Sequence, residues 1–322
     1  MRKNWTEMIA LLLVAALLTM GFSGCAPASE PVGPGPGVDE PVDPIEPTPP
    51  EPPALELTVF GDSTYPGDAF GVEIKNSGDE LPVVSFTLDE DTYEVPVFRD
   101  GERVLALVPV KLRATTPIQG VVSASRERGA VAQATAEITV MTKEFPEVQQ
   151  FVETDEMREI KEGEKEPIDG ERTAAALSNP SADRLFEGRF DLPLEGRITT
   201  EFGQQRYRNG EYYYTHTGID LGARQGREVA APNSGVVVLA EKLDVGGNVI
   251  IIDHGFHIFS YYMHLSEFKV EVGDSVAKGD VIGLVGSTGY STGPHLHYAL
   301  SVDDYPIDPY FFNDQDPMEL FS

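Results

Sequence analysis

Apolar and polar residues alternate in short runs over the segment 55–143, and a period of two residues is typical of β-strands. Turn residues separate the runs at Pro66-Gly67, Ser77-Gly78 and Asp100-Gly101. Because neighbouring side chains of a strand point to opposite faces, this pattern predicts a small β-sandwich. The predicted strands are Leu55–Phe60, Phe70–Ile74, Val83–Leu88, Tyr93–Phe98, Val104–Val110 and Ala132–Val140.

A second region of short β-rich runs, with more glycine, extends over residues 190–314 and leaves a tail at 315–322. We expect a second all-β domain here. Its clearest predicted strands are Arg197–Thr200, Gly235–Ala240, Asn248–Asp253, Ile258–Met263 and Val281–Val285.

The segment 144–189 between the two β regions is polar and strongly charged. A weak helical periodicity is present at Phe151–Lys161 and again at Arg172–Leu177. We interpret the segment as a short helical, charged connector without chemistry of its own.

The first 25 residues have the pattern of an export signal: a basic start, an apolar run from Met8 to Met20, and small residues before Cys25. A permanent membrane-spanning helix needs about 20 apolar residues, so this run is short for one. Ser23-Gly24-Cys25 resembles the lipobox of bacterial lipoproteins, with Phe22 at a position that is usually Leu. Lipidation of Cys25 and an extracytoplasmic, membrane-anchored location are therefore predicted. The alternative is an ordinary signal sequence with an incidental thiol.

Residues 26–54 are almost entirely Pro, Gly, Glu, Asp and Val, so they are predicted to form a disordered linker. Over the 322 residues, 24 Lys and Arg stand against 53 Asp and Glu, a formal net charge of −29. Such a charge repels phosphate backbones, which makes nucleic acid an unfavourable partner. The composition leaves the oligomeric state open.

The clearest chemical signal is that all six histidines of the chain lie in the second β region. His295-Leu296-His297 begins a predicted strand after the Gly293-Pro294 turn. Residues two apart on a strand share a face, so both imidazoles project into one site and Leu296 points to the core. One ring can be a metal ligand, and its neighbour a supporting or catalytic group.

His216 and Asp220 form a second pair, separated by three residues that include Gly218. The glycine favours a turn or short strand, in which both side chains can reach a common ion. Two neutral imidazoles and one carboxylate form the three-ligand set of a catalytic zinc site, with the fourth position open for water. A structural zinc site would have four ligands, often thiolates, and Cys25 is the only cysteine.

The other histidines give weaker signals. His264 ends an aromatic strand without a partner at ligand spacing; beside the two pairs above it becomes a candidate acid or base. His254 and His257 flank a glycine turn, and for both we expect a structural, hydrogen-bonded role.

Three motifs in fixed order resemble the LytM or lysostaphin-type zinc metallopeptidases. They are His216-x3-Asp220, Tyr262-Met263-His264-Leu265 and Gly293-Pro294-His295-Leu296-His297. The resemblance covers about Leu192 to Tyr310 and includes framework segments such as Ala231-Pro232-Asn233-Ser234-Gly235 and Gly286-Ser287-Thr288-Gly289.

This resemblance implies that residues 190–314 form a LytM-type domain similar to a barrel-sandwich hybrid. Together with the Ig-like β-sandwich expected from strand alternation at 55–143, it predicts an all-β chain. It also implies that His216, Asp220 and His297 bind one zinc ion and that His264 and His295 are catalytic, without deciding which of the two is the general base. The implied activity is hydrolysis of the peptide cross-links of peptidoglycan by metal-activated water.

Two other functions compete with this hypothesis. A LytM-like lipoprotein can bind the wall or activate a hydrolase without cleaving, but here all five site positions are present. A biotinyl or lipoyl carrier would explain the valines and glycines of Val272–Val285, but not the histidine pairs. The endopeptidase hypothesis accounts for more of the sequence than either.

Overall fold

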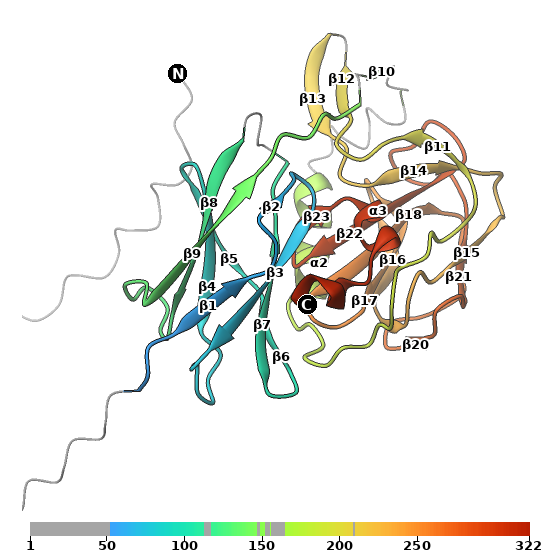
Figure 1. Ribbon diagram of the computed structural model, residues 1–322. Coiled ribbons are helices and arrows are strands. Elements are labelled where there is room, and N and C mark those ends of the chain that lie inside the picture. Colours follow the sequence, from blue (N-terminus) through green and yellow to red (C-terminus); the bar gives the residue numbers. More distant parts are fainter. Residues whose placement is uncertain (1–51, 113–116, 147–148, 152–154, 156–164, 209) are drawn as a thin grey trace, which may run out of the picture. The chain divides into compact units, whose positions relative to one another are not determined.

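The computed structural model describes residues 52–112, 117–146, 149–151, 155, 165–208 and 210–322. The described chain is predominantly β, as predicted from the sequence (Figure 1). The predicted signal peptide, with Cys25, and nearly all of the predicted linker lie outside the described residues.

The N-terminal β region forms two sheets that enclose a core of alternating side chains. One sheet has the strand order β1-β3-β7-β6, and the other has the order β2-β9-β8-β4-β5. Their bounds are β1 Glu56–Val59, β2 Ser63–Thr64, β3 Ala69–Lys75, β4 Val83–Leu88, β5 Asp91–Val95, β6 Val97–Asp100, β7 Arg103–Pro109, β8 Ile118–Ser125 and β9 Ala134–Val140.

The predicted single strand Tyr93–Phe98 is divided at Pro96 into β5 and β6. Proline has no N–H for a strand ladder, so the chain leaves one sheet there and enters the other. Strand β8, which the sequence did not predict, lies between β9 and β4 at the centre of the five-stranded sheet.

Strands β3 and β7 are buried on both faces. Alternate residues such as Val104 and Ala106 of β7 face the core of the sandwich. Leu105 and Leu107 face a second core, which also contains Phe256 and Phe321 from the C-terminal part of the chain. One sheet therefore contributes to two cores, within a single compact unit that extends from Glu51 to Ser322.

The connector contributes one strand and one helix to the described structure. Strand β10, Gln149–Phe151, pairs in parallel with β12. Helix α2, Lys165–Leu177, includes the predicted helical stretch Arg172–Leu177 and begins earlier. Most of the other predicted helix, Phe151–Lys161, lies outside the described residues, and its first residue belongs to β10.

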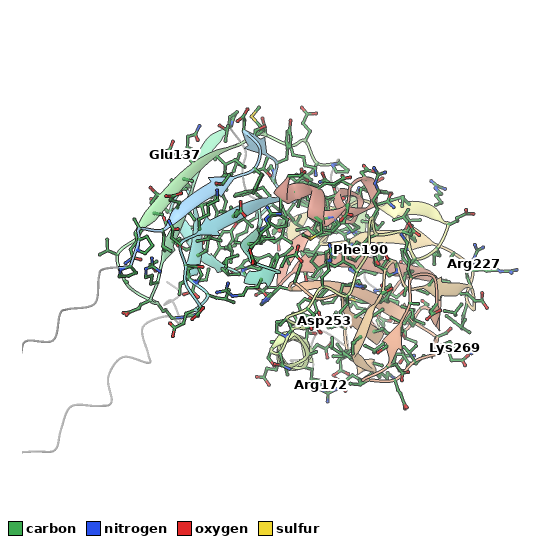
Figure 2. The ribbon with its side chains drawn as sticks, turned by 60° about the horizontal axis from the view of Figure 1, so that its bottom comes forward. Glu137, Arg172, Phe190, Arg227, Asp253 and Lys269 are labelled. Atoms are coloured by element: carbon green, nitrogen blue, oxygen red, sulfur yellow. The ribbon has the colours of Figure 1, made fainter. Side chains whose placement is uncertain are left out.

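The C-terminal region is built on an eight-stranded sheet with the order β11-β14-β22-β18-β17-β16-β20, to which β23 is added beside β22. Two three-stranded sheets, β15-β21-β19 and β10-β12-β13, accompany it. Phe190 is buried among its side chains, while Arg227 and Lys269 lie at the outer edge (Figure 2). The bounds are β11 Arg197–Thr200, β12 Gln205–Arg208, β13 Glu211–Thr215, β14 Ile219–Gly222, β15 Glu228–Ala230, β16 Gly235–Leu243, β17 Gly247–Asp253, β18 Ile258–Leu265, β19 Glu267–Phe268, β20 Ser275–Val276, β21 Val281–Leu284, β22 His295–Val302, β23 Tyr305–Ile307, α3 Pro309–Asp314 and the 3-10 helix η2 Pro317–Phe321.

No helix in the described part of the chain is long and apolar enough to cross a membrane.

A chain of buried polar groups crosses the core of this region. His254 is fully buried, and its Nδ1 donates to the carbonyl of Ser234 at 2.8 Å. Its Nε2 accepts from the Ser260 hydroxyl at 2.7 Å, and that hydroxyl accepts from Tyr262 at 2.7 Å. Burial lowers the pKa of His254 from 6.5 to about 4, although the Ser234 hydrogen bond and Asp253 act in the opposite direction. His254 has the structural role expected from the sequence.

Because the pKa of His254 is lower in the folded state, the unfolded chain takes up the proton first as pH falls. The contribution of His254 to stability is therefore expected to decline between pH 6.5 and 4. The difference in free energy of unfolding between wild type and His254→Gln should shrink over this range by up to about 3 kcal/mol. Denaturant titrations at several pH values measure it, and a constant difference would contradict the buried neutral state.

Candidate metal centre

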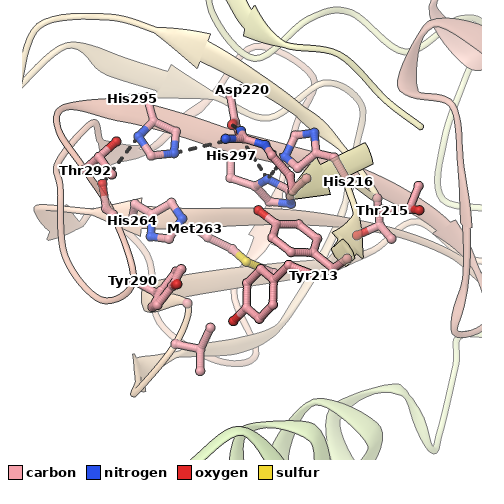
Figure 3. A pocket seen from close by; sticks show the side chains of 16 residues that line it. Tyr213, Thr215, His216, Asp220, Met263, His264, Tyr290, Thr292, His295 and His297 are labelled. Carbon is pink, nitrogen blue, oxygen red and sulfur yellow. Dashed lines mark hydrogen bonds and ion pairs between the residues drawn. The ribbon is translucent and has the colours of Figure 1, made fainter. Parts of the chain in front are cut away.

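Strand pairing brings together residues that are distant in the sequence. In the antiparallel register of β14 and β22, Asp220 lies directly opposite His297. His216 stands in the turn between β13 and β14, so its side chain reaches the same place. Sheet pairing and a short turn therefore bring His216, Asp220 and His297 together (Figure 3).

Three donor atoms form a nearly equilateral triangle. His216 Nε2 lies 3.0 Å from Asp220 Oδ1 and 3.0 Å from His297 Nδ1. His297 Nδ1 lies 3.0 Å from the same carboxylate oxygen. His216 and Asp220 are buried, with only 3% and 7% of their surface exposed.

The triangle has the dimensions and the chemistry of a cation site. In tetrahedral zinc coordination, bond lengths near 2.1 Å place neighbouring ligand atoms roughly 3.4 Å apart. Hydrogen bonds alone serve at most two of the three edges, because each ring nitrogen carries at most one proton and the carboxylate carries none. A cation attracts the lone pairs of all three atoms, so the donor set fits a metal ion.

Neighbouring groups orient two of these donors. His216 Nδ1 donates to the carbonyl of Glu201 at 3.0 Å, which leaves the Nε2 lone pair directed into the triangle. Arg206 Nη2 donates to Asp220 Oδ2 at 3.1 Å and also bonds the Thr200 hydroxyl. The two oxygens of Asp220 are thus divided, one facing the imidazoles and the other facing the guanidinium.

The charge states agree with this arrangement. Burial opposes ionisation of Asp220, but its interactions with His216 and His297 outweigh burial and hold the pKa of the carboxyl below its usual value. Burial lowers the pKa of His297, with Asp220 acting in the opposite direction. An ionised carboxylate beside a neutral imidazole is the protonation state that metal binding requires.

Two more histidines face the same space. The ring centroids of His264 and His295 are 4.8 Å apart, and His295 Nε2 lies 3.8 Å from Asp220 Oδ1. His264 Nδ1 donates to Thr288 O and His295 Nδ1 donates to Gly293 O, each at 2.8 Å. In the neutral rings, Nε2 is then free of a proton. Burial and the nearby histidines lower the pKa of His264 to about 3.

These side chains open into a pocket of about 720 Å³. Its walls include Tyr213 and Tyr290, whose ring centroids are 6.4 Å apart, and Met263 (Figure 3). The sequence analysis did not assign the tyrosines or Arg206 to the site. The aromatic run Tyr212–Tyr214 immediately before His216 is the signal that could have indicated Tyr213.

The structure therefore brings five of the seven histidine and aspartate residues singled out in the sequence into one pocket. His216, Asp220, His264, His295 and His297 all line the pocket. His257 does not, and instead its Nδ1 bonds Asp303 Oδ1 at 2.5 Å.

Comparison with known proteins agrees with this geometry. Residues 214–309 match the family model described as Peptidase family M23. The DD-carboxypeptidase/endopeptidase Mpg of Neisseria meningitidis is 41% identical over 113 residues, which are 35% of this chain and 26% of Mpg. The peptidoglycan DD-endopeptidase ShyA of Vibrio cholerae is 36% identical over 129 residues, 40% of this chain and 30% of ShyA.

A crystal structure of a Pseudomonas aeruginosa protein assigned to peptidase M23 resembles most of the chain. The TM-score is 0.54 at 26% sequence identity, and the match covers 77% of this chain and 94% of that one. The chain spans only about a quarter to a third of the length of the curated relatives above. The matched segment holds His216, Asp220, His264, His295 and His297, and residues 214–309 form a peptidase family M23 domain, of the LytM/lysostaphin family.

Proposed function

We propose that this chain is a zinc endopeptidase that hydrolyses the peptide cross-links of bacterial peptidoglycan. The observation that carries the proposal is the triangle of donor atoms from His216, Asp220 and His297, each 3.0 Å from the other two, at the base of a pocket with two further histidines. Two of the relatives are named for endopeptidase activity, and ShyA is named for peptidoglycan.

In this proposal His216 Nε2, Asp220 Oδ1 and His297 Nδ1 hold one zinc ion. Nitrogen and carboxylate donors suit zinc, and a three-ligand protein set leaves a coordination position open, as catalytic sites do. When bound, zinc supplies Lewis acidity that polarises a peptide carbonyl and makes water more acidic.

His264 and His295 would manage the protons of the reaction. Each donates its Nδ1–H to a backbone carbonyl, so in the neutral form of each ring Nε2 can accept a proton from water. The same nitrogen, once protonated, can donate to the oxyanion or to the departing amine. The geometry supports both residues in this role equally.

The pocket suits an extended peptide. Its walls combine aromatic rings with small hydroxyl side chains such as Ser291 and Thr292. Among the described residues that line it, Asp220 and Arg206, which pair with each other, are the only charged ones besides histidine. Groups of this kind bind a peptide backbone and compact side chains. The alternative function is a wall-binding or hydrolase-activating protein that does not cleave.

Removal of the metal is expected to abolish cleavage. Purified protein should hold about one zinc per chain and cleave muropeptides, and a chelator should stop the reaction until zinc is restored. His297→Ala should lower zinc affinity at least about 100-fold, because it removes a direct ligand. Metal analysis and mass spectrometry of digested wall fragments measure both effects.

The control for this experiment is His257→Ala, a histidine outside the pocket, which should keep full zinc content and cleavage. If wild-type protein binds zinc but releases no fragments, the non-cleaving alternative is favoured. If His297→Ala retains wild-type zinc affinity, the ligand assignment is wrong.

Loss of His264 should separate catalysis from metal binding. His264→Ala is expected to lower kcat by about 10²- to 10⁴-fold, because a positioned proton acceptor is lost, while zinc affinity stays unchanged. The same comparison with His295→Ala tests the second candidate. Steady-state kinetics with zinc-loaded protein measure the change, and a kcat near wild type would remove the residue from the reaction.

We propose further that the protein acts outside the cytoplasm and is anchored by lipid on Cys25. The support is the apolar run followed by Ser23-Gly24-Cys25. In cells expressing the full chain, radiolabelled fatty acid should label the wild type, and Cys25→Ser should be unlabelled and leave the membrane fraction. Equal labelling of both proteins would exclude Cys25 as the attachment point.

A further inference from the structure

Asp169 of helix α2 binds two consecutive backbone amides of a loop in the peptidase domain. It accepts from Asp244 N at 3.0 Å through Oδ1 and from Val245 N at 2.6 Å through Oδ2. The residue is buried, with 8% of its surface exposed. Both carboxylate oxygens are therefore committed to the loop, although α2 lies outside the segment that matches the family model.

The loop bound by Asp169 joins β16 to β17 and forms part of the pocket wall through Val245 and Gly246. The carbonyl of Val245 accepts from Tyr290 N at 2.8 Å. The carbonyl of Gly246 accepts from His264 N, also at 2.8 Å. Two consecutive peptide groups thus connect the connector helix to a pocket tyrosine and to a candidate catalytic histidine.

His264 depends on such support because its backbone is in the left-handed region, with φ of +64°. Residues with a Cβ adopt this conformation at an energetic cost, so the surrounding structure has to maintain it. Besides the bond to Gly246, its ring donates to Thr288 O. Thr288 Oγ1 in turn accepts from Asn248 N at 2.9 Å, at the start of β17.

The helix itself is held against the domain. Ala176 and Leu177 pack on a cluster that includes Leu243, the last residue of β16. Arg172 adds an exposed ion pair with Glu241 at 3.7 Å, a kind that contributes little. The apolar contact holds α2 at the end of the same strand whose following loop Asp169 binds.

We propose that Asp169 is a positioning residue of the active site, which holds the Asp244–Gly246 loop so that His264 and Tyr290 keep their places in the pocket. The inference rests on the proposed function, because it treats this pocket as the site of cleavage. The donors of the metal triangle lie on β14, β22 and the turn before β14, so the loop does not carry them. Metal binding and catalysis should therefore respond differently to the loss of Asp169.

The experiment compares Asp169→Ala with Glu171→Ala, which removes an exposed carboxylate from the same helix. In zinc-loaded Asp169→Ala, kcat is expected to fall roughly 10- to 100-fold, as for small displacements of reacting groups. Zinc affinity should stay at the wild-type value, and Glu171→Ala should match wild type in both. Asp169→Asn, which keeps one acceptor oxygen, should have an intermediate kcat.

Hydrogen exchange gives a second measurement that needs no activity. In Asp169→Ala the amides of Asp244, Val245, His264 and Tyr290 should exchange faster, while those of Asp220 and His297 stay unchanged. If the alanine variant does not accumulate as folded protein, the kinetic and hydrogen-exchange measurements are made on Asp169→Asn instead.

The outcomes distinguish the two proposals. Wild-type kcat and unchanged exchange in folded Asp169→Ala would overturn the positioning role, as would a parallel loss of zinc affinity and kcat, which indicates general destabilisation. If the wild-type protein does not cleave at all, the proposed function fails, and hydrogen exchange alone decides whether Asp169 holds His264 and Tyr290.

Discussion

The pairing of β14 with β22 is the constraint on which the candidate metal centre depends. It places Asp220 opposite His297, and the short turn before β14 adds His216. A shift of one strand by one residue would place the two side chains on opposite faces of the sheet. Burial of polar groups costs free energy unless they are hydrogen-bonded or bind a cation. This register allows both for the three donor residues.

The surrounding groups satisfy the atoms that the triangle does not use. The carbonyl of Glu201 accepts from Nδ1 of His216, and Arg206 donates to Oδ2 of Asp220. The carbonyls of Thr288 and Gly293 accept in the same way from Nδ1 of His264 and Nδ1 of His295. All three rings donate to main-chain carbonyls, so their orientation follows from the backbone and not from mobile side chains.

The parts of the chain outside the family match are integrated with the peptidase domain. Leu105 and Leu107 of the sandwich share a core with Phe256 and Phe321, and Asp169 of the connector binds a loop of the pocket. A sheet with two buried faces cannot separate from its neighbour without exposing apolar surface to water. The sandwich and the connector are therefore structural parts of this unit rather than simple spacers.

The sequence by itself determined the β class of the chain and the residues that line the site. Strand alternation has a period that local sequence reveals, and the spacing His295-x-His297 places both rings on one face whatever the partner strand is. The resemblance in three ordered motifs then indicated which histidines belong together. Local sequence could not predict the division of Tyr93–Phe98 between two sheets or the central place of β8, because both depend on pairing with distant strands.

Only the tertiary structure decided which neighbours support the site. Tyr290 and Asp169 are far in the sequence from the residues that they support, and Arg206, although only ten residues before His216, reaches Asp220 because β12 pairs with β13. Asp169 in particular lies in a charged segment that the sequence presents as a connector without chemistry. Its role depends on hydrogen bonds to two backbone amides of a distant loop. Because nearly every residue has a backbone amide, no side-chain pattern predicts such a contact.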